Sequence, residues 1–463
     1  MNLVILQPVA DARAAERAYR DEIAVLAAAL RQCGHTVSLA VVTPDDETAV
    51  AATMAEVRPD LVLVYIEALA ADVAARAAGA VASALGAPLI PFGPHARLCP
   101  DRCLSLPGAE AVAVGPADAV VPAYIEARAS SVDSLRTPGF WVKCETGVMQ
   151  NPPPPPPDDL AAAPSPARDL YRSEQTLDSA GFAPVTVARG GEARAAGRGE
   201  PQAPARPAAA AWPVRHRPVD ACIAEMRRVA ETQLDLGGWR VGNERWTSSP
   251  AWLSDFADRY HKEIGLPIRT TLHAGDVKDK AASLLAHAGC EEATVPVGSA
   301  SNLIRNEVLG MDAPEGAVVK AFSALRRAGV RTVARVQVGA PYETRVTLDE
   351  TTALLGRLEP DRIEAVLHYP APGSEAERIA RENGWLVPDP AAAHLAGRPA
   401  VVLPSFPADD LATACELLPY VVHRPQIVPL LRLARRVRIG RCGTAYDLLL
   451  KPFLVPPVRR KKP

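Results

Sequence analysis

The sequence lacks the features that most readily identify membrane, exported and nucleic-acid-binding proteins. Its formal net charge is only −2 over 463 residues, so there is no general electrostatic case for nucleic acid or an anionic membrane as a partner. We find no run of about 18 apolar residues, and no charged segment precedes the first apolar run. We therefore expect a cytoplasmic protein that binds neither membrane nor nucleic acid.

Cysteine is present but scattered, with eight residues spread over the whole chain. A long cytoplasmic protein normally keeps such thiols reduced, which argues against a disulfide framework. Cys99 and Cys103 have the spacing of two metal ligands, but Leu106 stands where a third cysteine would be needed. A two-cysteine metal site stays open as an alternative, although we predict no metal ligands in this chain.

The most unusual absence lies between Gly190 and Ala211, where the chain has no Val, Leu, Ile, Cys or aromatic residue. A GC-rich gene gives such a composition when it is read out of frame. Ordinary sequence returns with Arg215 and Arg217 and a helical pattern after them. Two explanations stay open, an in-frame decay of the segment or two compensating frameshifts. The atypical stretch 234–249 fits either.

The first 125 or so residues alternate short apolar strands with helical segments, which predicts a parallel, doubly wound α/β sheet. Ligands of such sheets bind beyond the carboxyl ends of the strands. The predicted strands are 3–6, 37–42, 61–65, 88–91 and 112–114. The residues expected around one crevice are Gln7-Pro8, Tyr65-Ile66-Glu67, Phe92-Gly93-Pro94-His95 and Gly115-Pro116.

Six consecutive prolines at 152–157 predict an extended spacer after this domain. Strands and helices alternate again between about 182 and 385. Six βα units predict a partial (β/α) barrel whose active face lies at the carboxyl ends of its strands. Its predicted strands are 183–188, 234–236, 268–272, 293–297, 332–338 and 362–368. We expect the helical stretches 411–420 and 428–437 to cover this barrel.

Short motifs along nearly the whole chain resemble those of the cobalamin-binding radical SAM family. Gly93-Pro94-His95 and Gly115 are similar to that family's Gly-Gly-Pro-His and Gly-Glu motifs, and 304–309 is similar to the helix after its fourth barrel strand. Further matching segments are 164–171, 339–344, 369–374 and 382–386. The resemblance implies a cobalamin-binding Rossmann-like domain at 1–145, a proline-rich linker at 146–180, a radical SAM-like partial barrel at 181–388 and a helical C-terminal region at 389–463.

The sequence departs from the family where the family does its chemistry. There, an Arg-Gly at a strand end is followed by Cys-x3-Cys-x2-Cys, which holds a 4Fe–4S cluster. After Arg189-Gly190 the three cysteine positions are occupied by Gly191, Ala195 and Arg198, none of which is an iron ligand. The cluster is expected from the family, but its ligands are absent. Three further family positions, an acidic pair, a Glu-Ser-Gly and a basic residue, correspond to Gly237-Gly238, Gly298-Ser299-Ala300 and Met311.

The resemblance also implies the cofactors and their contacts. Cobalamin is expected, without a histidine below the cobalt because the Asp-x-His-x-x-Gly motif is absent, and S-adenosylmethionine is a second candidate. The implied cofactor contacts are Pro8, Glu67, Gly93, Pro94, His95, Gly115, Ser299 and Glu343. Alternatives stay open, a turn cap for His95, an exposed helix acid for Glu67 and helix capping for Glu343. No catalytic residue is assigned, although His273 is a candidate general base at a strand end.

The resemblance implies a cobalamin-dependent methyltransferase that acts on a small-molecule intermediate of natural-product or antibiotic biosynthesis. In that chemistry the cofactor carries the hard step and the protein positions the substrate. The alternative is a cluster-less, non-catalytic paralogue that binds cobalamin or pairs with an active homologous protein. Polar methyl transfer without a radical is a third hypothesis. The sequence does not identify the substrate.

Overall fold

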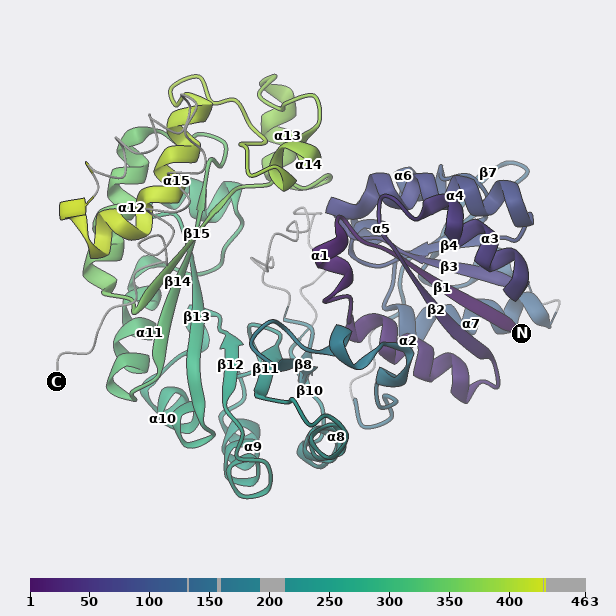
Figure 1. Ribbon diagram of the computed structural model, residues 1–463, viewed down its shortest axis with the longest axis horizontal. Helices are drawn as coiled ribbons and strands as arrows, with labels where there is room; N and C mark the ends of the chain where they lie inside the picture. The colour runs from purple at the N-terminus through teal and green to yellow at the C-terminus, as the bar shows by residue number, and fades with distance from the viewer. Residues whose placement is uncertain (131–132, 156–159, 192–212, 428, 430–463) are drawn as a thin grey trace. The chain divides into compact units, whose positions relative to one another are not determined.

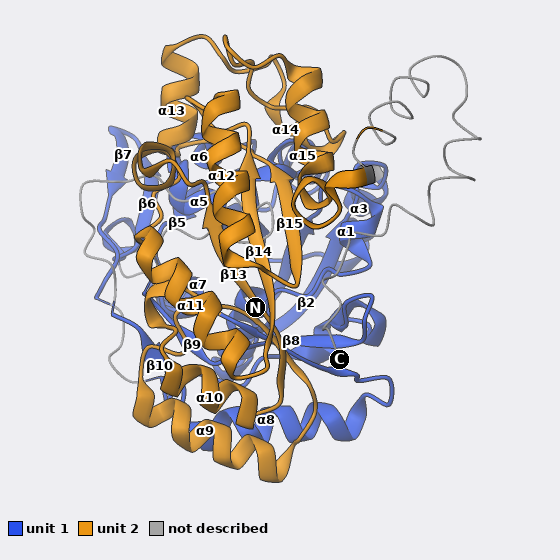
Figure 2. Cartoon of the chain, turned by 90° about the vertical axis from the view of Figure 1, so that its left-hand side faces the viewer, with its two compact units in different colours: residues 1–191, 208–242 blue, residues 192–207, 243–463 orange. Residues whose placement is uncertain are grey.

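The computed structural model describes all residues except 131–132, 156–159, 192–212, 428 and 430–463 (Figure 1). The chain divides into two compact units (Figure 2). Unit 1 ends at Gly242 and unit 2 begins at Asn243. This division lies well beyond the proline run at which the sequence predicts the first domain to end.

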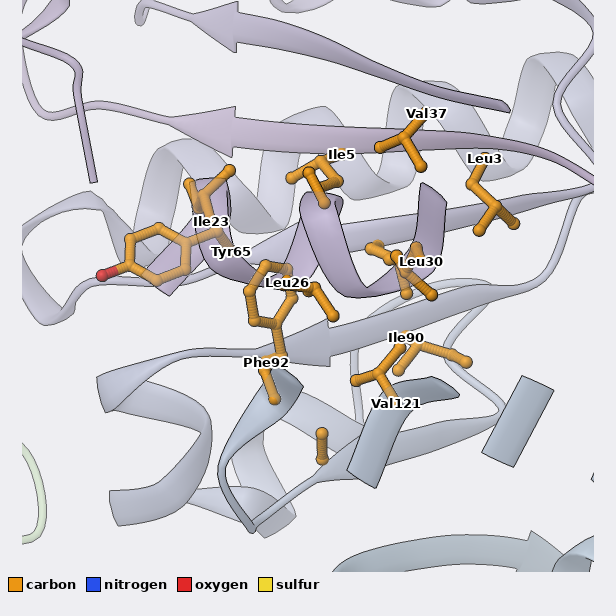
Figure 3. Close-up of a cluster of buried hydrophobic side chains, with 14 of the residues drawn as sticks. Leu3, Ile5, Ile23, Leu26, Leu30, Val37, Tyr65, Ile90, Phe92 and Val121 are labelled. Atoms are coloured by element: carbon orange, nitrogen blue, oxygen red, sulfur yellow. The ribbon is translucent and has the colours of Figure 1, made fainter. Parts of the chain in front are cut away.

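Unit 1 is built on a parallel sheet, as the sequence predicts, and the structure shows the strand order β2-β1-β3-β4. Its strands are β1 (Asn2–Pro8), β2 (Thr36–Val42), β3 (Leu61–Tyr65) and β4 (Leu89–Phe92). Successive side chains of a strand point to opposite faces. Leu3 and Ile5 therefore pack with α2 (Asp21–Gln32), as Figure 3 shows, whereas Val4 and Leu6 pack with α4 (Ala71–Leu85). Helices on both faces make the sheet doubly wound.

The fifth strand of this domain joins a different sheet from the predicted one. A parallel bridge between Leu89 and Ala109 leads into β5 (Ala111–Ala113). That strand then pairs antiparallel with β6 (Phe140–Cys144), which pairs with β7 (Gly147–Gln150). The segment of the predicted fifth strand therefore joins β4 through one parallel bridge, but its regular pairing is antiparallel, with β6.

The expectation that no long apolar span exists is also wrong. Ala68–Leu85, comprising η1 (Ala68–Ala70) and α4, has a mean hydropathy of 1.4 over 18 residues, long and apolar enough to cross a membrane by length and composition. Its alanine content produces this value. Ala74, Ala77, Ala78 and Val81 are fully buried in the core of unit 1, so α4 packs on the sheet as an ordinary core helix.

Part of the predicted linker contributes to the core of unit 1. Ala167 and Tyr171, which follow the prolines, belong to the same buried cluster as Ile5 and Tyr19. The Tyr171 hydroxyl also donates to Oε1 of Gln7 at 3.0 Å. A sequence scan for breakers finds the prolines but not the return of the chain to the core behind them.

Unit 1 also contains the first strands and helix of the predicted barrel. β8 (Phe182–Thr186) pairs in parallel with β11 (Gly238–Gly242), β9 (Ala188–Arg189) pairs with β10 (Arg215–His216), and α8 spans Val219–Thr232. The strand predicted at 234–236 is wrong. Leu234 is 97% exposed, whereas Trp239 and Val241, five and seven residues further on, are buried.

Unit 2 carries four parallel strands paired in succession, β12 (Ile268–Thr271), β13 (Cys290–Gly298), β14 (Arg331–Val338) and β15 (Arg362–Leu367). The connecting helices are α9 (Pro250–Glu263), α10 (Asp279–His287), η6 (Leu303–Val308), α11 (Glu315–Arg327) and α12 (Arg345–Leu358). Three helices follow, α13 (Glu375–Glu382), α14 (Pro390–Leu395) and α15 (Ala408–His423). The predicted helix at 411–420 is confirmed, and that at 428–437 lies outside the described part of the chain.

Candidate functional site

In unit 1, the candidate cofactor residues lie where parallel strands end. Pro8 is the last residue of β1, Glu67 follows β3, and Gly93 and Pro94 follow β4. Gly93 has a φ of 103°, and a Cβ there would lie 2.9 Å from the Tyr65 ring. The loop after β4 therefore requires glycine for its own backbone conformation and packing.

Glu67 is held in an ion pair by Arg20, the residue that precedes α2. The guanidinium Nη2 of Arg20 donates to Oε2 of Glu67 at 3.0 Å, and its Nε donates to Oε1. The Glu67 side chain is 16% exposed. The pair joins the loop after β3 to the start of α2, so Glu67 is neither a free helix acid nor an unpaired polar contact.

The side chain of His95, at the same edge, has a ring nitrogen that is available for a hydrogen bond. It is 4% exposed, and its backbone N–H donates to the Ile66 carbonyl at 3.0 Å. Its Nδ1 is buried and has no hydrogen-bond partner among the described residues. Burial lowers the pKa of the imidazole to about 4, with a smaller contribution from Arg102. A neutral ring with an unpaired buried nitrogen is costly unless a ligand or water satisfies it.

Gln7 and Gly115, which the sequence also predicts near the cofactor, make contacts within the protein instead. Gln7 Oε1 accepts from Tyr171 and its Nε2 donates to the Ala18 carbonyl at 2.5 Å, which closes the end of β1. At Gly115 an added Cβ would lie 2.8 Å from Val120. Gly115 follows β5 rather than a strand of the parallel sheet. The end of β4, with the unpaired nitrogen of His95, is therefore the part of this edge that offers a buried polar atom to a ligand.

In unit 2, Ser299 follows β13 and is fully buried. Its Oγ accepts from the Ser301 backbone N–H at 3.2 Å and lies 3.4 Å from the Thr351 hydroxyl. Arg305, also buried, donates to the Ser299 carbonyl at 2.9 Å. These contacts fix the loop after β13 and leave the Ser299 side chain engaged within the protein.

Glu343 lies in the loop after β14 and is 1% exposed. Its Oε2 accepts the backbone N–H of Gly339, and its Oε1 is buried with no partner among the described residues. Burial raises the pKa of this carboxyl to about 7, opposed by the Gly339 hydrogen bond. The N-cap of α12 is the neighbouring Thr344, so the side chain of Glu343 closes its own loop instead of capping the helix.

Glu244 is a candidate that the sequence analysis missed. Because β11 begins at Gly238, the residues after this strand are Asn243 and Glu244, not Gly237-Gly238 as predicted from a strand at 234–236. Burial raises the pKa of Glu244 to about 7, and the charge of Arg335 opposes this shift. Trp239 and Val241 are buried at alternate positions of β11. This apolar alternation is the sequence signal that places the strand and therefore places Glu244 just after it.

His273 follows β12, as predicted, but its ring nitrogens are not arranged for a general base. Nδ1 accepts the backbone N–H of Gly275 at 3.2 Å, so the ring proton resides on Nε2. Burial lowers the pKa of the ring, and the charge of Arg245 lowers it further. With that proton the buried Nε2 is a hydrogen-bond donor, and the backbone of Asp312 also interacts with the ring. The nitrogen that a base would use is therefore engaged by the backbone of its own loop, and the role of His273 as a general base stays a prediction.

The residues present do not fit a 4Fe–4S cluster. Of the three cysteine positions, Gly191 is described and carries no ligand atom, while Ala195 and Arg198 lie outside the described residues and are not thiolates either. Within the described ranges, no group of three or more His, Cys, Asp or Glu side chains is placed to hold a metal ion.

Solved structures with this fold carry the cofactors that the motifs suggest. Radical S-adenosylmethionine methyltransferase TsrM from Kitasatospora setae, with tryptophan substrate and a SAM analogue bound, gives a TM-score of 0.64 at 16% identity over 82% of this chain and 76% of that one. The cobalamin-dependent S-adenosylmethionine radical enzyme OxsB, with aqua-cobalamin and S-adenosylmethionine bound, gives 0.69 at 11% identity over 98% and 71%.

The sequence matches no protein-family model and no curated protein. At these identities the structural likeness shows the fold alone. That fold is a Rossmann-like domain followed by a radical SAM-type partial barrel and a helical C-terminal region.

Proposed function

We propose that the chain is a cobalamin-binding protein of the methyltransferase type, which uses its Rossmann-like domain for the cofactor and its partial barrel for a small-molecule methyl acceptor. The observation that carries this proposal is the unpaired, buried Nδ1 of His95 at the carboxyl end of β4. The likeness of fold to OxsB and TsrM supports cobalamin as the ligand. We further propose a cytoplasmic location and a natural-product intermediate as substrate.

Cobalamin, when bound, supplies a transferable methyl group. The residues of unit 1 have the task of holding it. Neutral His95 offers a hydrogen bond at Nδ1 that costs no deprotonation at pH 7, because its pKa is about 4. The Arg20–Glu67 pair and the left-handed backbone of Gly93 fix the loops on either side of that nitrogen. A preformed, rigid edge loses less entropy when the cofactor binds.

The second candidate is a non-catalytic paralogue that binds cobalamin or pairs with an active homologous protein. Gly191, Ala195 and Arg198 in place of three cysteines favour it, because they offer no thiolates for a 4Fe–4S cluster such as the one bound in the TsrM structure. Polar methyl transfer is compatible with the same residues. Both methyl-transfer hypotheses and the cobalamin-binding paralogue require cobalamin, whereas a paralogue that only pairs with an active protein does not, so cobalamin binding is the first property to test.

Equilibrium dialysis of the full chain against hydroxocobalamin provides this test. We expect retention of the cofactor, with about tenfold weaker binding in His95→Leu, which removes one hydrogen bond. His95→Asn keeps a polar atom near the position of Nδ1 and should bind more tightly than His95→Leu. His287→Leu, at a half-exposed histidine of α10, is the matched control and should bind as the natural chain does. Equal binding by all four proteins would overturn the role of His95.

A further inference from the structure

The loop from β1 to α2 (residues 9–20) begins at the edge of unit 1 where cobalamin is proposed to bind. It contains the short helix α1 (Ala12–Ala15), which is capped by the side chain of Asp11. Between α1 and α2, the backbone N–H groups of Tyr19 and Arg20 donate to a segment that is far away in the sequence. The position of this part of the loop therefore depends on that distant segment.

The distant segment is residues 167–176, here called the post-proline segment, and its central contact is made by Tyr171. The Tyr171 hydroxyl accepts the backbone N–H of Arg20 at 3.3 Å and donates to Oε1 of Gln7 at 3.0 Å. Burial raises the pKa of this phenol, so the hydroxyl keeps the proton that it donates. One buried oxygen therefore joins the end of the loop to the strand from which the loop starts.

Gln175 and the Tyr171 ring hold the same loop at two further places. Nε2 of Gln175 donates to the Ala15 carbonyl at 3.2 Å, and the Gln175 carbonyl accepts the backbone N–H of Tyr19 at 3.3 Å. The rings of Tyr19 and Tyr171 pack with their centroids 5.1 Å apart. All three side chains are buried, so leaving their polar groups unpaired would be costly. These contacts therefore favour a single conformation of the loop.

The post-proline segment is itself anchored to other elements of unit 1. Nη2 of Arg168 donates to the Pro184 carbonyl of β8 at 2.6 Å and to Oε1 of Glu225 on α8 at 2.9 Å. The backbone N–H of Ala167 donates to the Ala24 carbonyl of α2 at 2.9 Å. The segment is therefore a fixed support from which the loop takes its position.

A chain of contacts leads from this support to His95. Tyr171 holds the backbone of Arg20, and the Arg20 guanidinium pairs with Glu67 in the loop after β3. The neighbouring Ile66 carbonyl accepts the backbone N–H of His95 at 3.0 Å, at the start of α5 (Pro94–Leu98). Each link of this chain is a hydrogen bond or an ion pair between residues of unit 1.

We propose that Tyr171 is a positioning residue for the cobalamin site, which holds loop 9–20 and, through Arg20 and Glu67, the place of His95. A ligand-binding side chain keeps its geometry only when the residues behind it are fixed in turn. A loop that is already ordered also costs less entropy when the ligand binds. The link to cobalamin rests on the proposed function, but the support of the loop does not.

Equilibrium dialysis of the full chain against hydroxocobalamin tests the effect on the cofactor. Tyr171→Phe removes the hydroxyl and keeps the ring, and we expect about tenfold weaker binding. Tyr124→Phe is the matched control, because it removes another buried hydroxyl of unit 1, which donates to Glu110 at 3.3 Å. The control should bind as the natural chain does. Equal binding by the two variants would overturn the inference.

A double substitution tests whether Tyr171 acts through the Arg20–Glu67 pair. Glu67→Gln weakens that pair directly, and substitutions that act through one contact do not have additive effects. Tyr171→Phe combined with Glu67→Gln should therefore bind about as weakly as Glu67→Gln alone. A double variant whose loss equals the product of the two single losses would contradict this path.

Hydrogen exchange of the cobalamin-free chain, measured by mass spectrometry, tests the support of the loop without the cofactor. Tyr171→Phe should speed exchange in residues 9–20 about tenfold and leave 71–85 of α4 unchanged, whereas Tyr124→Phe should change neither. Unchanged exchange in 9–20, or faster exchange in both segments, would overturn the inference. If the exchange result holds but the natural chain retains no cobalamin, the proposed function fails and the support of the loop stands. Cobalamin retained equally by both tyrosine variants gives the reverse.

Discussion

Arg217 lies with its Nη1 2.7 Å from Oε2 of Glu225, and both side chains are buried. Arg168 pairs with the other oxygen of the same carboxylate at 2.9 Å and stacks 4.5 Å from the centre of the Tyr19 ring. One buried network in unit 1 thus joins residues from before and after the unusual segment 190–211. The chain on both sides of that segment is built for the same fold.

This network limits where the sequence can have been altered. The stretch 234–249 also packs well, since Trp239 and Trp246 are fully buried and the indole N–H of Trp246 donates to Thr270 at 2.9 Å. We therefore predict that any difference found by resequencing the gene falls within codons 191–212. A corrected Cys-x3-Cys-x2-Cys after Arg189-Gly190 would retire the non-catalytic paralogue. A frame change inside 234–249 would contradict the packing argument.

Removing Glu225 should strongly destabilise unit 1. Glu225→Gln removes the carboxylate that pairs with two buried guanidinium groups, and breaking a buried ion pair typically costs about 3–5 kcal/mol. Urea unfolding monitored by tryptophan fluorescence measures the loss. The control is Glu382→Gln, which breaks the exposed pair with Arg378 and should change stability by less than about 0.5 kcal/mol. Equal effects of the two substitutions would show that the network does not stabilise the fold.

A substitution at Gly93 should lower the stability of the folded chain, whether or not a ligand is present. Gly93→Ala forces a side chain into a φ of 103° and against the Tyr65 ring, at an expected cost of about 1–3 kcal/mol. Gly316→Ala in α11 is the opposite control, because its Cβ would meet nothing within 4 Å. That change should stabilise by up to about 1 kcal/mol. Thermal melts of both variants check the prediction, which fails if Gly93→Ala melts at the natural temperature.

The buried carboxyl of Glu343 should make stability depend on pH in a specific direction. Its pKa is raised from 4.5 to about 7 in the folded chain, so its contribution is fully present below pH 4.5 and is lost as pH rises through 7. Glu343→Gln should match the natural protein at pH 4.5 and exceed it at pH 8.5, by up to about 3 kcal/mol. Denaturant-induced unfolding at pH values between 4.5 and 8.5 measures this difference in the free energy of unfolding. The exposed Glu350→Gln controls for loss of one carboxylate, and parallel pH curves for all three proteins would refute the prediction.

The sequence predicts the scaffold better than the site, for physical reasons. The run Leu3–Leu6 identifies a strand because a sheet buried on both faces needs continuous apolar residues. The predicted strand at 234–236 failed because Leu234 is apolar but lies in an exposed turn. Local composition does not distinguish an exposed leucine from a buried one.

Site residues depend on contacts between segments that are far apart in the sequence. His95 was found because it follows a strand within a recognisable motif. Glu67, a predicted cofactor contact, instead forms an ion pair with Arg20. Ser299 instead contacts Thr351 and Ser301. Neither interaction can be predicted from the spacing of residues in the sequence. Glu244 was missed through a strand displaced by four residues.

The central claim is that this chain binds cobalamin and does not hold an iron–sulfur cluster. The most direct measurement is the cobalt and iron content of the full-length protein after anaerobic reconstitution with hydroxocobalamin, iron and sulfide, followed by gel filtration and elemental analysis. The account predicts cobalt retained at a stoichiometric level and iron close to zero. Protein that retains iron and sulfide stoichiometrically, or that releases all its cobalt, would contradict it.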